Sequence, residues 1–190
     1  MKLFRDLSIA AAAVVLLGCA SKPHDECSFP DGAGKAPSWA CAPYAVEGFK
    51  DTGYGTYPKS GAGYQFSLDQ AAAKARAMLA TQVKTRLTDA VRAFASANGV
   101  GTSEAVQAAA STATVQITEA TLVGAKLARS TTDPKGAVHV VVGMDVDRST
   151  RVLQEALSAA MQSQPAVWRQ VGGNRSPAEM QAEILKMGSR

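Results

Sequence analysis

Histidine, cysteine and aromatic residues are scarce in this chain of 190 residues, which holds 2 His, 3 Cys and 6% aromatic residues. These counts leave few side chains for a metal framework built from repeated Cys and His pairs. The net charge is +4, yet the sequence has no run of Lys or Arg, so we expect no nucleic-acid partner. It also has no glycine-rich phosphate loop, Gly-x-Ser-x-Gly motif or His-Glu-x-x-His motif, and we expect no cofactor.

A long hydrophobic run is missing as well. The main apolar stretch, residues 7–17, is shorter than the roughly 20 residues that span a bilayer. It follows Lys2 and Arg5, and a positive segment before a short apolar one is typical of an export signal. We therefore expect residues 1–18 to be a signal peptide that is removed.

The apolar stretch ends in Leu-Leu-Gly-Cys at residues 16–19, which resembles the lipobox cleaved by the lipoprotein signal peptidase. This resemblance implies that Cys19 becomes the first residue of the mature protein and carries acyl chains such as palmitate. Two or more acyl chains anchor a protein stably in a lipid bilayer. Ala20 stands where Asp would favour the inner membrane, so the resemblance implies the outer membrane, with the domain in the periplasm and surface exposure as an alternative.

Residues 19–43 are rich in Pro, Gly and Ser, and this composition predicts a flexible tether. Cys27 and Cys41 are an even pair in an exported protein, which favours a disulfide. Closing so short a loop stabilises by roughly 3 kcal/mol in the chain-entropy model. A metal or thiol site is the alternative, but the needed repeated spacings are lacking, and the residues it would use are His24, Asp25, Glu26 and Cys27. We expect Trp39 to pack the end of the tether onto the domain.

Residues 44–164 form the expected domain. Weak alternation over 44–49 predicts a first strand. Ser67 and Gln70 form a capping box for a long helix that ends at Asn98-Gly99. The apolar positions of this helix recur every three or four residues: Leu68, Ala72, Ala75, Leu79, Val83, Leu87, Val91 and Phe94.

The second half of the domain is expected to pair two strands. A weak helix over 103–110 precedes a predicted strand from Val115 to Leu127 with a change of phase near Glu119. Asp-Pro-Lys-Gly at 133–136 predicts a type I turn. A strand over 138–146 follows, with Val138 and its alternate residues on one face and His139 on the other.

Two further helices are predicted after this hairpin. Ser149 caps one that ends before Pro165 and is expected to cover the sheet. In the tail, residues 165–190, a short helix starts at Ser176-Pro177 with Glu179 completing a capping box. Its few apolar residues are expected to dock loosely or to contact a partner: Met180, Ile184 and Met187. The predicted fold class is α+β, a small antiparallel sheet covered on one face by a long helix and a second helix.

The alanine-rich segment 71–80, which follows the Trp39 segment and the Ala45-Val46 pair, resembles the Lpp-twenty family, named for a twenty-kilodalton outer-membrane lipoprotein. The resemblance covers roughly residues 37–148, and its most specific part is Ala-Arg-x-x-Leu-Ala at 75–80. It implies an outer-membrane lipoprotein without known catalytic residues. Some relatives act in flagellar or envelope structures, and similar small lipoprotein domains activate peptidoglycan synthases.

Candidates for chemistry are few. His139 lies between valines in a strand, and Asp145 and Asp147 could pair on one strand face, although acids just before a helix usually cap it. Helical geometry places Arg76 on the apolar side of the long helix, where it either snorkels or pairs with Glu119 or Asp145. Two basic residues, Lys74 and Arg92, are expected on the opposite, solvated face.

The sequence thus favours a non-enzymatic lipoprotein that presents its domain to an envelope protein of unknown identity. Self-association is an alternative, as is regulation of peptidoglycan synthesis or a role in flagellar or envelope assembly. A third alternative is an envelope hydrolase that uses His139, Asp145 or Asp147.

Overall fold

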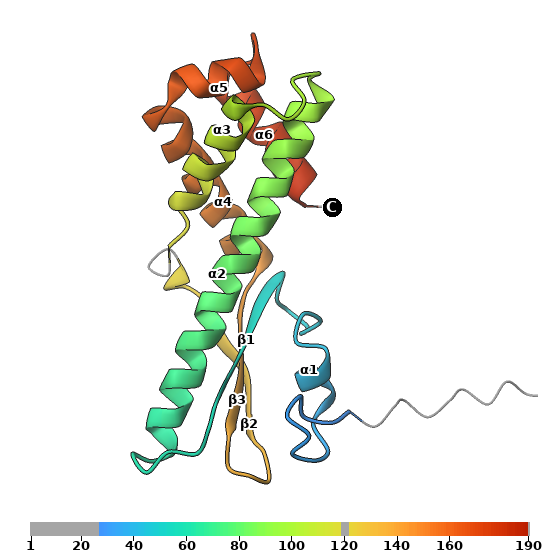
Figure 1. Cartoon of the computed structure of the whole chain (residues 1–190), viewed down its shortest axis with the longest axis vertical. Coiled ribbons are helices and arrows are strands. Elements are labelled where there is room, and N and C mark those ends of the chain that lie inside the picture. The colour runs from blue at the N-terminus through green and yellow to red at the C-terminus, as the bar shows by residue number, and fades with distance from the viewer. Residues whose placement is uncertain (1–26, 119–121, 190) are drawn as a thin grey trace, which may run out of the picture.

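A computed structural model describes residues 27–118 and 122–189. The molecule is elongated, with a small sheet at one end, a helical bundle at the other and the long helix α2 running through both (Figure 1). The elements in chain order are α1 (Ser38–Cys41), β1 (Asp51–Tyr57), α2 (Tyr64–Ala97), α3 (Glu104–Val115), β2 (Lys126–Thr132), β3 (Val138–Met144), α4 (Val146–Ser163), α5 (Pro165–Gly172) and α6 (Pro177–Gly188).

The sheet is antiparallel with strand order β1-β3-β2, which confirms the predicted α+β class. The predicted hairpin joins β2 and β3: the Gly136 N–H donates to the Asp133 carbonyl at 2.9 Å, and Gly136 takes a φ of 86°. The first strand is a correction, because residues 44–49 form turns and β1 begins at Asp51.

Glycine explains the position of β1. A Cβ atom at Gly53 would lie 2.1 Å from the Ala75 carbonyl oxygen, and one at Gly55 would lie 2.1 Å from that of Ala71. The backbone of α2 therefore rests directly on β1, which only glycine in the strand and alanine in the helix permit. Glycine is otherwise unfavourable in strands, so propensity points away from this segment.

The long helix differs from its prediction at its start. It begins at Tyr64 after Gly63, whose φ of 98° lets the chain turn into the helix before Ser67. Ser67 is buried instead of capping, and its hydroxyl donates to the Pro58 carbonyl at 3.4 Å. The predicted end is confirmed, since Asn98 caps the helix and Gly99 has a φ of 74°.

The region between α3 and the sheet is also corrected. Val115 ends α3 instead of starting a strand, and Ile117 and Leu122 insert into the core. Strand β2 begins only at Lys126, and its irregularity lies between Leu127 and Arg129, not near Glu119. Val115 and Ile117 alternate in the sequence like strand residues, but Val115 is exposed and the buried residues Ala113 and Ile117 are four apart, which is helical spacing.

The helical end of the molecule is built by α3, α4, α5 and α6 around the second half of α2. Helix α4 packs on α3 and α6 instead of covering the sheet as expected, so α2 is the main helical cover of the sheet. Asp145, not Ser149, caps α4 by accepting from the Arg148 N–H at 2.8 Å. Helix α5 was not expected from the sequence, and its Trp168 is fully buried.

The opposite face of the sheet is covered by residues 27–49. All seven residues of β3 are buried, because the side chains facing away from α2 contact this segment. A Cβ atom at Gly143 would lie 2.3 Å from a ring carbon of Phe49. The predicted tether thus contains a folded part, which includes residues 27–43 and belongs to the third layer of the sheet end.

Candidate functional site

The predicted lipidation residue Cys19 lies outside the described residues, as do His24, Asp25 and Glu26 of the alternative metal site. Cys27 and Cys41 are joined in a disulfide, with their Cα atoms 5.9 Å apart, as the sequence predicted. Oxidation removes the Cys27 thiolate that a metal site would need. Within the described ranges, no group of three or more His, Cys, Asp or Glu side chains could hold a metal ion.

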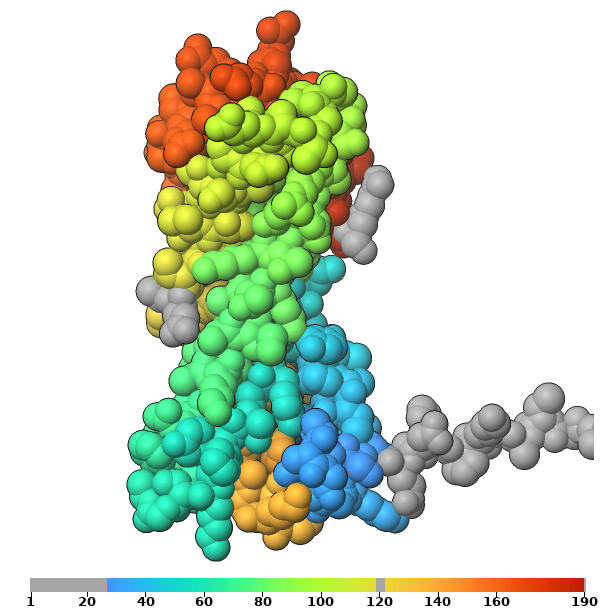
Figure 2. Space-filling model, viewed as in Figure 1, coloured from blue at the N-terminus to red at the C-terminus, as the bar shows by residue number. Residues whose placement is uncertain are grey.

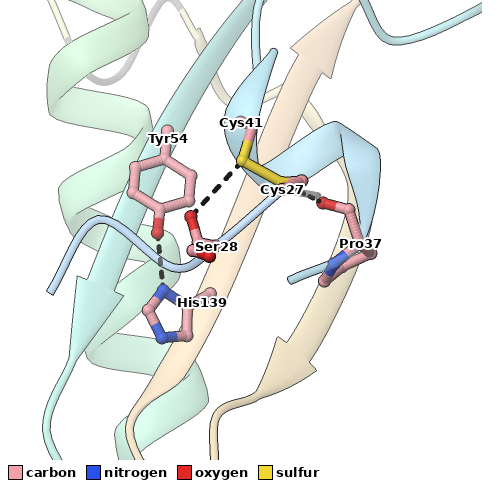
Figure 3. Close-up of a disulfide and its surroundings, with 6 residues drawn as sticks. All are labelled: Cys27, Ser28, Pro37, Cys41, Tyr54 and His139. Atoms are coloured by element: carbon pink, nitrogen blue, oxygen red, sulfur yellow. Dashed lines mark hydrogen bonds between the residues drawn. A yellow bond between two sulfur atoms is a disulfide. The ribbon is translucent and has the colours of Figure 1, made fainter. Parts of the chain in front are cut away.

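The disulfide closes a compact segment over the sheet. Ser28 and Lys35 form a β-bridge, and the Phe29 N–H donates to the Gly34 carbonyl at 3.0 Å. A small apolar cluster fills the segment, and its members are Phe29, Ala33, Ala36, Trp39 and Ala40. The sulfur atoms lie 3.2 Å and 3.3 Å from the carbonyl oxygens of Pro37 and Ser28 (Figure 3). Trp39 packs within this segment, whereas the sequence predicted that it packs the tether onto the domain.

His139 lies beneath this segment, 1% exposed, at the centre of a hydrogen-bonded row of side chains. Its Nδ1 lies 2.5 Å from the Tyr54 hydroxyl (Figure 3), and its Nε2 lies 3.3 Å from a carboxylate oxygen of Asp133. A neutral imidazole fits these partners, with Nε2–H donating to the carboxylate and Nδ1 accepting from tyrosine. The Phe29 ring covers the imidazole, with centroids 4.4 Å apart.

The environment changes the pKa of both partners of His139. Burial would raise the pKa of Asp133, but the hydrogen bonds from the Ala137 N–H and from His139 outweigh it and lower this pKa. Burial raises the pKa of Tyr54, and the negative charges of Asp31 and Asp133 add to this effect. The row therefore holds an ionised carboxylate at one end and a neutral phenol at the other.

This row has the components of a proton relay, but both ring nitrogens of His139 are already bonded and Phe29 covers the ring face. The other two residues of the hydrolase hypothesis lie elsewhere. Asp145 is six residues further along, about 20 Å in extended chain, where it caps α4 and lies 4.0 Å from Lys126. Asp147 is exposed in the first turn of α4. The structure does not bring these three residues together.

A second polar cluster was missed by the sequence analysis. Arg86 of α2 forms a two-pronged ion pair with Asp51 of β1, and Ser149 of α4 bonds to both. The Arg86 Nη2 atom lies 2.9 Å from the Asp51 carboxylate and 3.0 Å from the Ser149 hydroxyl. The cluster ties the sheet to two helices at the middle of the molecule. The sequence did contain a sign of this cluster: Arg86 stands three residues after Val83, so it falls on the apolar stripe of the helix.

Arg76, which the sequence analysis singled out instead, is half-buried on α2. One of its expected partners, Glu119, lies outside the described residues, and the other, Asp145, pairs with Lys126. Lys74, by contrast, places its ammonium group 5.0 Å from the centre of the Tyr57 ring. Arg92 is exposed, as expected.

The tail helix is anchored more firmly than expected. The predicted capping box of Ser176 and Glu179 is present. Met180 and Ile184 are 2% and 0% exposed, and they belong to the main core instead of the surface. Met187 is partly buried and lines a cleft of about 500 Å³ between α2 and α6.

The match to a protein-family model decides the identity of the chain. The model of the LPP20 lipoprotein covers residues 37–145, more than half of the sequence. The chain belongs to the LPP20 lipoprotein family. This is the Lpp-twenty family that the 71–80 segment resembled, and the family match includes the disulfide residue Cys41, the sheet and all of α2.

Neither the comparison with curated proteins nor that with solved structures gives a match. None of the helices in the described part of the chain is both long and apolar enough to cross a bilayer. Membership in a lipoprotein family is consistent with attachment through a lipid on the chain.

Proposed function

We propose that this chain is a non-enzymatic lipoprotein of the outer membrane, anchored through acyl chains on Cys19, whose domain faces the periplasm and binds other envelope proteins. The observation that carries this proposal is the combination of the LPP20 family match with the Leu-Leu-Gly-Cys segment at residues 16–19. Cys27 belongs to the folded disulfide segment and is eight positions after Cys19, so an anchor at Cys19 would hold the domain close to the bilayer.

The use of the polar residues supports a role in binding. His139 bonds to Asp133 within the hairpin and to Tyr54 of β1, and Asp145 caps a helix. The cluster of Arg86 and Asp51 braces the sheet against the helices. Each of these polar groups bonds to another part of the fold. This use of polar residues is typical of a rigid scaffold whose surface binds other proteins.

The exposed apolar residues supply contact positions that the buried tail helix does not. Val115, the last residue of α3, is 66% exposed, and Val123, in the connection from α3 to β2, is 78% exposed. Single exposed apolar residues are common, so these two serve as probe positions and do not define an interface.

Labelling in cells with an alkyne-bearing fatty acid tests the anchor. The wild type should incorporate label and sediment with outer membranes, Cys19→Ala should do neither, and Ser21→Ala should behave as wild type. Label retained in Cys19→Ala would overturn the anchoring site. Label with sedimentation in the inner membrane would overturn the location.

A photoreactive residue at Val123 tests the binding role. A specific cross-link to another envelope protein, lost in Cys19→Ala, would support it, and capture of a peptidoglycan synthase would make the role regulatory. Cross-links only to a second copy of the chain would replace the proposal by self-association.

A further inference from the structure

Three loops meet at the end of the molecule that carries the sheet. They are residues 31–35 of the disulfide segment, 58–63 before α2, and 133–136 of the hairpin. A Cβ atom at Gly136 would contact the Lys59 side chain at 2.9 Å, and one at Gly34 would lie 3.5 Å from Pro134. We call this surface, together with the first turn of α2, the loop end; it is the lower end in Figure 2.

The loop end exposes aromatic side chains. Tyr64 and Phe66 are 54% and 40% exposed, although each has a large apolar ring. Phe66 packs edge-on against Tyr57, with ring centroids 5.8 Å apart. Helix α2 could have begun with polar residues here, because the main core starts only at Leu68 and Ala71.

Lysines surround these rings. Lys74 lies over the Tyr57 ring, Lys59 lies against the hairpin turn, and Lys135 is 63% exposed at 3.8 Å from Asp31. Lys35 is exposed in the disulfide segment. Aromatic rings mixed with lysines are typical of protein surfaces at the boundary between water and lipid, where rings enter the headgroup region and ammonium groups meet phosphates.

The length of chain before Cys27 decides which end is held near a bilayer. Cys27 is eight positions after Cys19, and these eight steps span at most about 28 Å. Cys27 belongs to the segment at the loop end, since its carbonyl accepts from the Ala36 N–H at 2.7 Å. Helix α2 alone extends about 50 Å away from this end, so an anchor at Cys19 holds the loop end near the lipid, and the helical end would reach it only if the domain lay along the bilayer.

We propose that the loop end rests on the headgroup surface of the bilayer that holds the acyl chains of Cys19, with Tyr64 and Phe66 entering the headgroups and the lysines contacting lipid phosphates. The inference rests on the proposed anchoring at Cys19. It sets the long axis of the domain away from the membrane and presents the helical end to the periplasm. Anionic lipid strengthens the contact, because each lysine near such a surface contributes about fivefold to binding.

The test uses the full lipidated protein in vesicles of phosphatidylethanolamine and phosphatidylglycerol that contain brominated lipid, which quenches nearby dyes. One sample carries an environment-sensitive dye on a non-natural residue at position 62, in the loop end. The matched sample carries it at position 102, just beyond the far end of α2. We expect loss of fluorescence at position 62 and none at position 102. Equal loss at both positions, or loss only at 102, would overturn the orientation.

Two variants separate this contact from simple tethering. The double change Tyr64→Ser and Phe66→Ser should reduce the quenching at position 62, and the control Met78→Ser, about 20 Å further along α2 and 44% exposed, should not. Quenching unchanged by the double change would overturn the role of the rings. Mass analysis of each sample reports whether Cys19 is acylated. Acylated protein without quenching at position 62 refutes this inference alone. Protein without acylation at Cys19 refutes the proposed anchor.

Discussion

Replacing Gly55 by alanine tests the close packing of α2 on β1. The added Cβ would lie 2.1 Å from the Ala71 carbonyl oxygen and 2.5 Å from the Ala75 nitrogen. Both are backbone atoms fixed by helical hydrogen bonds, so the helix must shift away from the strand. Overpacking of this kind costs about 1–3 kcal/mol, and we expect a value near the upper end because backbone meets the new methyl group.

Part of that cost is offset. Alanine restricts the unfolded chain more than glycine does and recovers roughly 0.5–1 kcal/mol. The expected net loss for Gly55→Ala is therefore about 2 kcal/mol. For a domain of this size it corresponds to a fall in Tm of roughly 4–8 °C.

The assay is urea unfolding of the protein without its signal peptide, followed by circular dichroism, together with a thermal scan. Gly61→Ala is the matched control, because a Cβ atom there meets no atom within 4 Å. It should stay within about 0.5 kcal/mol of wild type. If Gly55→Ala proves as stable as Gly61→Ala, the helix does not rest on the strand backbone and this account of β1 fails.

Three further predictions concern the disulfide, the buried carboxylate and the tail helix. Cys41→Ser should lower the free energy of unfolding by about 3 kcal/mol and remove the effect of dithiothreitol on stability, and a wild type insensitive to the reductant would contradict this. The lowered pKa of Asp133 contributes stability that is present above the unfolded pKa of about 3.9 and is lost as pH falls through the folded pKa. The free energy of unfolding should therefore fall less on acidification in Asp133→Asn than in the wild type. The same acid dependence in both proteins would contradict this assignment. Ile184→Ala should cost about 2–5 kcal/mol in urea unfolding, whereas the exposed control Ala182→Ser should cost little; similar values for both would place Ile184 outside the core.

Periodicity and capping predicted the elements that obey local rules. The end of α2 at Asn98, the turn at 133–136 and the capping box at Ser176 depend on contacts within a few residues, so the sequence contains the whole signal. The pairing of Cys27 with Cys41 followed from counting, because no other partner remained once Cys19 was assigned to the lipid.

Elements that depend on distant contacts were not predicted. Gly53 and Gly55 weaken any local strand signal, and they are used because a helix some twenty residues later lies on them. Trp168 lies in a short helix whose apolar face is complete only against α3. The coverage of β3 by residues 27–49 was also missed, because turn-rich composition does not show what a segment packs on.

The same distinction holds for the candidate site. His139 was identified as a residue to weigh, yet its partners Tyr54 and Asp133 come from another strand and from the hairpin turn, and only the fold brings them together. Arg86 was overlooked in favour of Arg76 because both lie on one helix, and the sequence does not tell which of them meets Asp51.

The most direct test of the central claim is the mass of the N-terminal peptide of the mature protein, purified from membranes and digested with a protease that cleaves after glutamate. The account predicts a peptide of residues 19–26 whose Cys19 carries a diacylglyceryl group on sulfur and an acyl group on its amine. A peptide that begins upstream of Cys19, or one that begins at Cys19 without lipid, would contradict the account.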